Sequence, residues 1–388
     1  MNHLIKTIKS SLALILSIAL PPWAMAQDAN HVQARLSQLE KQLNLLQESP
    51  LKLNTSLAQR FDVSALVELE TFIEDTNQDN NQDREKNNKS DTRLATIEVA
   101  IQSKLNPYIE GQVILLHEDD SDQDIAVDEG FLTLSAPDSS FSLKAGKQVI
   151  AFGNFESHLI TDPLTLELAE TKDTALTVQA QTKDYYAVLY VFNGANQTQD
   201  SQTQDSNDEI KQSGAQLGLI NNSAHSPWHL GAGYISSLAE SETFTDFFKE
   251  QASDYQLQGN TPAASVHGSL SIPHWHFLGE YIFATQSFHE DDLAFNEKPA
   301  QPSAYHLEIA RDFVLLNKAM TIALAQQGSQ QALALELPKQ RFIVALSHDV
   351  YKQTSLAVEY MQAKDYAINK GGSGNTQHTL SMQLAARF

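Results

Sequence analysis

Apolar and polar side chains alternate in segments of roughly ten residues from Phe61 to Phe388. A strand that crosses a bilayer in a barrel needs this pattern, because one face meets lipid and the other meets the lumen. The pattern predicts an all-β fold, a transmembrane antiparallel β-barrel over residues 61–388. About seventeen segments qualify, one of them at 332–337. Bacterial barrels normally have an even number of strands, so we expect about 16, with 14 to 18 compatible with the pattern.

The connections between these segments fall into two classes. Tight turns are predicted at residues 106–107, 183–184, 273–274 and 338–339. Longer polar loops are predicted at residues 74–91, 118–129, 196–212, 240–261 and 366–376. Short turns on one rim and long loops on the other are typical of a barrel in the outer membrane of a Gram-negative bacterium.

The end of the sequence carries a further signal for this location. Residues 380–388 alternate apolar and polar side chains, and the segment stops on Phe388. Outer-membrane barrels commonly end this way, because the insertion machinery reads the last strand. We therefore expect Phe388 to act as an assembly signal.

The first residues predict export. Lys6 and Lys9 precede an apolar run at 12–20, and Ala24-Met25-Ala26 forms an A-x-A cleavage site. This order is that of a secretory signal peptide, here residues 1–26, since the run is too short for a membrane span.

A short helix is predicted between the signal peptide and the barrel, at residues 27–50, with a linker at 51–60. Its apolar positions follow the 4, 3, 4, 3 spacing of a coiled-coil seam: Val32, Leu36, Leu39, Leu43 and Leu46. Two heptads associate weakly alone. Either the seam joins copies of the chain, for instance as a homotrimer, or the helix packs on its own domain.

Composition narrows the function. The chain has 26 Lys and Arg against 48 Asp and Glu, a net charge of −22, so we expect no nucleic-acid partner. It has no cysteine, which excludes disulfides and thiolate metal sites. A mean hydropathy of −0.32 argues against a bundle of membrane-spanning helices. We find no G-x-S-x-G or H-E-x-x-H motif and expect no enzyme, no cofactor and no metal site.

Several motifs resemble a known family. The stretch from Gly146 to Thr171, GKQVIAFGNFESHLITDPLTLELAET, is similar to the LbtU-type siderophore porins, as are the segments at 94–98, 113–119, 127–130 and 191–194. The resemblance implies an outer-membrane barrel that passes a ferric siderophore without a plug domain. It carries over no binding residue. A general or solute-selective porin without siderophore specificity is the alternative, and lipid and lipopolysaccharide would surround either.

The segment 152–171 is the candidate constriction of the pore. It holds Glu156, His158, Asp162, Glu167 and Glu170. It either folds into the lumen or forms an ordinary exposed loop with a short helix. If it folds inward, its acidity favours cationic or polyhydroxylated solutes, and a transverse field would come from three lysines: Lys144, Lys147 and Lys172.

Four arginines in strand segments are candidate lumen charges: Arg93, Arg311, Arg341 and Arg387. Charge on the lipid face of a barrel is costly, so these side chains are expected to face the lumen or the rim. There they either contact solute or form structural ion pairs.

Overall fold

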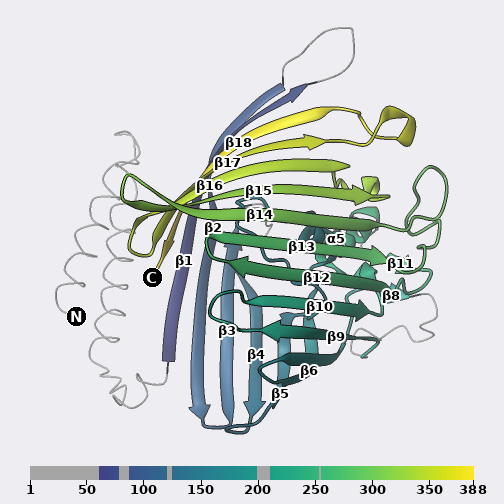
Figure 1. Ribbon diagram of the computed structural model, residues 1–388. Coiled ribbons are helices and arrows are strands. Elements are labelled where there is room, and N and C mark those ends of the chain that lie inside the picture. Colours follow the sequence, from purple (N-terminus) through teal and green to yellow (C-terminus); the bar gives the residue numbers. More distant parts are fainter. Residues whose placement is uncertain (1–60, 78–86, 120–124, 199–209, 253–254) are drawn as a thin grey trace, which may run out of the picture. The chain divides into compact units, whose positions relative to one another are not determined.

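The computed structural model describes residues 61–77, 87–119, 125–198, 210–252 and 255–388. Within these residues, sixteen strands form a closed antiparallel barrel, which confirms the predicted fold and strand number (Figure 1). The predicted signal peptide, the seam from Val32 to Leu46 and the linker lie outside the described residues.

The barrel strands follow the chain in order, each paired with its neighbours in sequence. Their bounds are β1 Phe61–Asn77, β2 Asn87–Asn106, β3 Ile109–Glu118, β4 Ala126–Ser135, β5 Phe141–Val149, β6 Lys172–Gln181, β7 Tyr185–Phe192, β9 Gln212–Asn221, β10 Trp228–Ile235, β12 Ala263–Ile272, β13 Trp275–Ala284, β14 Ser303–Leu315, β15 Lys318–Gln330, β16 Gln340–Tyr351, β17 Thr354–Lys364 and β18 Thr376–Arg387. Two short strands outside the barrel, β8 Gln197–Thr198 and β11 Gln256–Leu257, pair in parallel.

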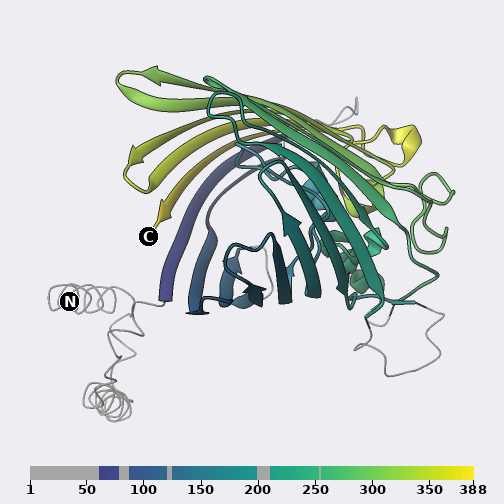
Figure 2. The same ribbon diagram turned by 60° about the horizontal axis from the view of Figure 1, so that its bottom comes forward.

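The barrel closes where β18 pairs with β1, and Figure 2 shows these two strands side by side. Leu69 lies opposite Leu384 in this pairing. At its end, the backbone N–H groups of Ala65 and Phe388 each donate to the other residue's carbonyl, at 3.3 and 2.9 Å. Phe388 therefore belongs to the closing seam, and its part in assembly remains a prediction.

Successive side chains of each strand point alternately toward lipid and toward the lumen. In β18, Leu380, Met382 and Leu384 are exposed on the outer face, while Ser381 and Ala385 are buried on the inner face. A belt of exposed apolar residues surrounds the barrel in this way, as lipid contact requires.

The two rims differ as the sequence predicts, with one correction. Tight turns such as 273–274 and 316–317 join strands at one rim, and long loops join them at the other. The expected strand at 332–337 is wrong. It is a loop that contains the 3-10 helix η2, Leu333–Leu335, with positive φ at Gln331 and Glu336. Residues 338–339 therefore end a connection at the long-loop rim.

The reason is packing. Ala332, Leu335 and Leu337 are buried in an apolar core at the long-loop rim, so their alternation marks contact with this core and not with lipid. The other helices of the long loops are α4 Leu164–Ala169, η1 Leu238–Glu240, α5 Glu242–Gln251 and η3 Ile368–Lys370.

The rim core joins α4, α5 and the inner wall of the barrel. The α4 helix contacts β13, β14, β15 and α5. Phe244 of α5 stacks on Phe288 with ring centroids 4.9 Å apart, and both rings are buried. None of the described helices is long and apolar enough to cross a bilayer.

Candidate functional site

The connection between β5 and β6, residues 150–171, folds into the barrel and reaches the opposite wall. Ile150, Phe152, Leu164 and Leu168 are buried in the rim core, so apolar packing fixes both ends of this inner loop. The inner loop also contains α4. The structure thus combines the two arrangements left open by the sequence, an inward fold and a short helix.

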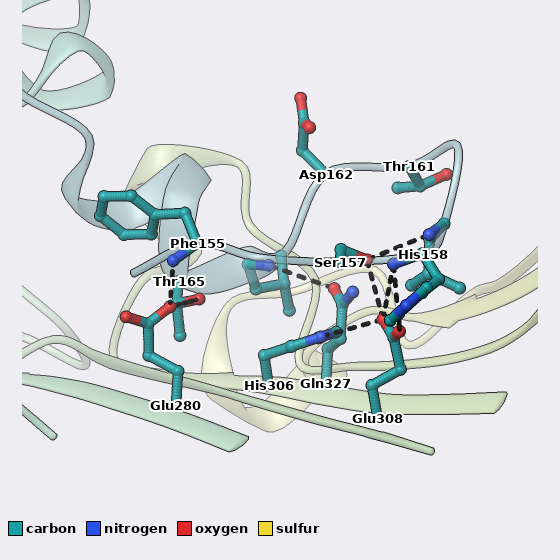
Figure 3. Close-up of polar contacts among 12 residues, drawn as sticks. Phe155, Ser157, His158, Thr161, Asp162, Thr165, Glu280, His306, Glu308 and Gln327 are labelled. Atoms are coloured by element: carbon teal, nitrogen blue, oxygen red, sulfur yellow. Dashed lines mark hydrogen bonds and ion pairs between the residues drawn. The ribbon is translucent and has the colours of Figure 1, made fainter. Parts of the chain in front are cut away.

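Glu280 on β13 accepts hydrogen bonds from the first part of the inner loop. The N–H groups of Asn154 and Phe155 donate to its carboxylate at 2.7 and 3.3 Å, and the Thr165 hydroxyl donates at 2.7 Å (Figure 3). A Cβ on Gly153 would come within 2.9 Å of the Glu280 carboxylate, so a residue without a side chain allows this close approach.

Glu308 on β14 binds the middle of the inner loop. It accepts from the His158 N–H at 3.0 Å and from the Ser157 hydroxyl at 2.8 Å. The Nδ1 atom of His158 lies 2.6 Å from the same carboxylate, and this hydrogen bond raises the pKa of the imidazole. His306 Nε2 lies 3.2 Å away on the other side.

Glu359 on β17 binds the next residues. The N–H groups of Ile160 and Thr161 donate to it at 2.7 and 3.1 Å, and the Thr161 hydroxyl also donates. Gln327 on β15 accepts from the Leu164 N–H at 3.1 Å. The irregular backbone of the inner loop thus finds its acceptors on the barrel wall, as backbone away from bulk water requires.

Asp162 points away from these anchors, as Figure 3 shows. It lines a cavity of about 300 Å³ between the inner loop and the wall of β1, β2, β3 and β18. We call this cavity the acidic passage. Its charged lining residues are Glu68, Glu70, Glu118, Asp119, Asp162 and Arg93.

The electrostatics of the acidic passage follow from this lining. The Asp162 side chain still contacts solvent, but protein atoms surround its carboxyl group closely. The resulting loss of hydration raises the pKa of this carboxyl group to about 6. The charges of Glu167 and Glu118 raise the pKa further, and Arg341 opposes them. Arg93 donates to Glu70 at 2.9 Å, which offsets one carboxylate.

Three of the four predicted lumen arginines face inward. Arg93 lies in the acidic passage, and Arg341 on β16 forms an ion pair with Glu167 of α4. Arg387 lies on the inner face of β18 at the short-turn rim. Arg93 and Arg341 are thus held in ion pairs.

Arg311 does not face the lumen, so its candidacy as a lumen charge is wrong, and it lies at the rim, the other position expected for it. It shares the outer face of β14 with the exposed Leu307, and its guanidinium lies 4.9 Å from the Trp275 ring centroid. The cation–π contact, close to the turn at 316–317, holds the charge at the outer rim of the barrel.

The three candidate lysines do not form a field across the acidic passage. Lys144 pairs with Glu129 at 3.7 Å on the inner wall, and Lys172 pairs with Asp128 at 3.0 Å and Glu170 at 3.5 Å. The carboxylates beside these two ammonium groups therefore neutralise them.

Lys147 lies on the outer face of β5. Its partners in register are Gly130 and Thr174, and one step along the same face Ala145 lies opposite Leu132 and Leu176, both exposed to lipid. Its Nζ donates to the Val127 carbonyl at 2.7 Å. The prediction of Lys147 as a pore residue is therefore wrong.

Glu156 is exposed in the lumen, near enough to His158 and His229 to act on both electrostatically. Among the described residues, no group of three or more His, Cys, Asp or Glu side chains is arranged to hold a metal ion.

The glutamates that anchor the inner loop are not among the residues predicted from the sequence. A signal was available: Glu308 and Glu359 each stand between residues whose side chains face lipid, and Glu280 precedes the lipid-facing Tyr281, so each carboxylate must face the lumen. That rule gives the face of the strand and leaves the partner open.

No protein-family model matches the chain. A UPF0422 protein of Coxiella burnetii is 29% identical over 279 residues, 69% of this chain and 58% of the relative. UPF0422 proteins of two Legionella pneumophila strains, Paris and Philadelphia 1, are 26% and 25% identical over 74% and 78% of this chain. The chain spans between 57% and 62% of the length of these relatives.

Several solved structures are similar to this barrel in fold although their sequences differ from it widely. OprB of Pseudomonas putida has a TM-score of 0.57 at 8% identity, covering 86% of this chain and 96% of OprB. The outer-membrane channel DcaP of Acinetobacter baumannii has a TM-score of 0.55 at 10% identity, covering 84% and 97%. The fold is that of outer-membrane porins. OmpF of Salmonella typhi, solved in complex with daunomycin, gives 0.53 at 10% identity over 84% and 97%.

Proposed function

We propose that this protein is a porin-type channel in the outer membrane of a Gram-negative bacterium, that it is not an enzyme, and that it passes small hydrophilic solutes with a preference for cations. One observation carries the proposal: the inner loop folds into the lumen, and between it and the wall lies the cavity lined mainly by carboxylates that we call the acidic passage. A selective channel needs a wetted path with charges that favour one class of solute.

The charges of the acidic passage support the cation preference. Carboxylates stand on both sides, Asp162 on the inner loop and Glu68 and Glu118 on the wall. Arg93, the cation among its lining residues, is paired with Glu70. An anion would therefore meet like charge from both sides, and a cation would be attracted.

The test is single-channel recording in planar bilayers. We expect stable channels whose reversal potential in a tenfold KCl gradient has the sign of a cation-selective pore, below the ideal limit of about 59 mV. Absence of stable conductance would refute the channel itself. Conductance with anion preference would refute only the assignment to cations.

A ferric siderophore is a second candidate solute, supported by the resemblance of residues 146–171 to the LbtU-type porins. Transport of a labelled ferric siderophore into proteoliposomes tests it. A deletion strain should also lose growth on that siderophore under iron limitation. If uptake of small solutes slows while siderophore use is unchanged, the general-porin function is correct.

The heptad seam from Val32 to Leu46 supports a homotrimer of the exported chain, with outer-membrane lipid and lipopolysaccharide around the barrels. Crosslinking through cysteines at Arg35 and Gln42 tests this assembly, because the natural chain has no cysteine. A trimeric ladder is expected, and monomers alone would contradict it.

A further inference from the structure

Three glutamates on three strands bind consecutive stretches of the inner loop. Glu280 binds residues 154–155, Glu308 binds 157–158 and Glu359 binds 160–161. One anchor thus serves about every third residue of a segment that has no regular secondary structure before α4.

These carboxylates are buried, with exposed fractions of 7% for Glu280, 5% for Glu308 and 1% for Glu359. A carboxylate away from water is costly unless hydrogen bonds satisfy its oxygens. Here the inner loop supplies the donors, and each carboxylate accepts at least two backbone or hydroxyl hydrogens. The loop and the wall therefore satisfy each other, and separating them would leave both unsatisfied.

The rest of the inner loop is held differently. Its ends pack through Ile150, Phe152 and α4 into the apolar rim core. In residues 153–162, Phe155 and Leu159 pack only partly buried against apolar residues, and Gln216 donates to the Gly153 carbonyl at 3.0 Å. The backbone N–H groups of this part are held chiefly by the three carboxylates. This is the part that places Asp162 beside the acidic passage.

We propose that Glu280, Glu308 and Glu359 are positioning residues that set the width and the ion preference of the pore by holding residues 153–162 against the wall. The consequence for transport rests on the proposed channel function. The attachment itself is independent of it, so the two are tested by separate measurements.

Replacing a glutamate by glutamine keeps the shape and removes acceptor capacity. The amide group of Gln turns one acceptor oxygen into an N–H donor that faces the N–H groups of the loop. We expect residues 153–162 to loosen in E280Q, E308Q and E359Q, and more in the triple variant, while the rim core keeps α4 in place.

A spin label reports the attachment directly. Glu156 is exposed in the lumen and the chain has no other cysteine, so E156C accepts one nitroxide label. We expect a broad spectrum in the otherwise natural barrel and a sharpened spectrum in the triple variant. E110Q is the matched control, because Glu110 is a wall carboxylate whose contact is Gln102 on the neighbouring strand, and its spectrum should stay broad.

Transport is measured on the same proteins in bilayers and by liposome swelling with sugars of increasing size. The triple variant should show higher conductance, a weaker cation preference and a larger size limit than E110Q. Heat-dependent migration on gels verifies that each barrel is closed before it is measured.

A measurement on the natural chain covers the case in which the triple variant does not fold. The amide hydrogens of Asn154, Ile160 and Thr161 should exchange slowly although they lie in irregular backbone, because buried carboxylates accept them.

Fast exchange, or a spectrum as broad in the triple variant as in E110Q, would overturn the proposal. A sharpened spectrum without any conductance would support the attachment and refute the channel. A sharpened spectrum with unchanged conductance and size limit would refute the role of the glutamates in setting the pore.

Discussion

The two sides of the barrel interior share one strand pattern and differ in what fills them. From β6 to β15, inner-face residues such as Val188, Ile235 and Ile282 pack against α4, α5 and the long loops. Along β1 to β3 and β18, the inner face presents Glu68, Glu70 and Gln383 to the acidic passage. Strand alternation builds the wall, and the inner face of each strand decides whether that part of the lumen is packed or open.

The largest effect is expected from the packed side. Phe244→Ala removes a buried ring that stacks on Phe288, and such truncations cost about 3–5 kcal/mol. Native-state proteolysis of residues 242–251 should show the loss. The ion preference should stay unchanged, because Phe244 does not line the acidic passage.

Ile368→Ala is the control, since Ile368 is exposed in the η3 loop and its truncation should cost little. If Phe244→Ala altered the ion preference as strongly as the rim stability, the separation between the packed and the open side would be wrong.

The next effect is expected from the open side. Asp162→Lys changes the charge beside the acidic passage by two units. One unit charge at 4 Å is worth about 1 kcal/mol in water and more in a confined space, so the cation-to-anion permeability ratio should fall about tenfold or more. Reversal potentials measure this ratio. Asp138→Lys, in the turn at 136–140, makes the same change away from the passage and should leave the ratio near its natural value.

The sequence predicts most of the barrel because every strand must alternate apolar side chains toward lipid with other side chains toward the lumen. Charged residues between apolar neighbours, such as Glu308 between Leu307 and Ile309, follow the same rule, so the inner face of each strand is also readable. The rule fails at 332–337, where the alternation reflects packing in the rim core. It also fails at Lys147, which the strand register places on the outer face. Arg311 lies on the outer face at the rim, where a cation–π contact holds it.

The partners inside the lumen are harder to predict. His158 and Glu308 are 150 positions apart in the sequence, and their contact depends on the inner loop crossing to β14. The local pattern of apolar and polar residues cannot predict that crossing. It identified His158 and Asp162 as candidates by residue type, and it had no means to show that one binds the wall and the other faces the passage.

A smaller effect is expected from pH. The pKa of Asp162 is raised to about 6, chiefly by burial, so its charge is present above pH 6 and is lost as the pH falls through that value. The cation preference should therefore decline between about pH 7 and pH 5. Asp162→Asn should have the lower preference already at pH 7 and lack this step. A step of equal size in Asp162→Asn would assign it to another group.

The smallest effect is expected at Lys147, and it tests the strand register that separates the two faces. Lys147→Gln and Lys144→Gln each remove one positive charge from β5, three positions apart. Lys144 faces the lumen beside Glu129, so its loss frees a carboxylate there and should raise the cation preference slightly. Lys147 faces outward, where the wall stands between it and the lumen, so its loss should leave the reversal potential unchanged. An equal shift in both variants would mean that both side chains reach the lumen, and the outer position of Lys147 would be refuted.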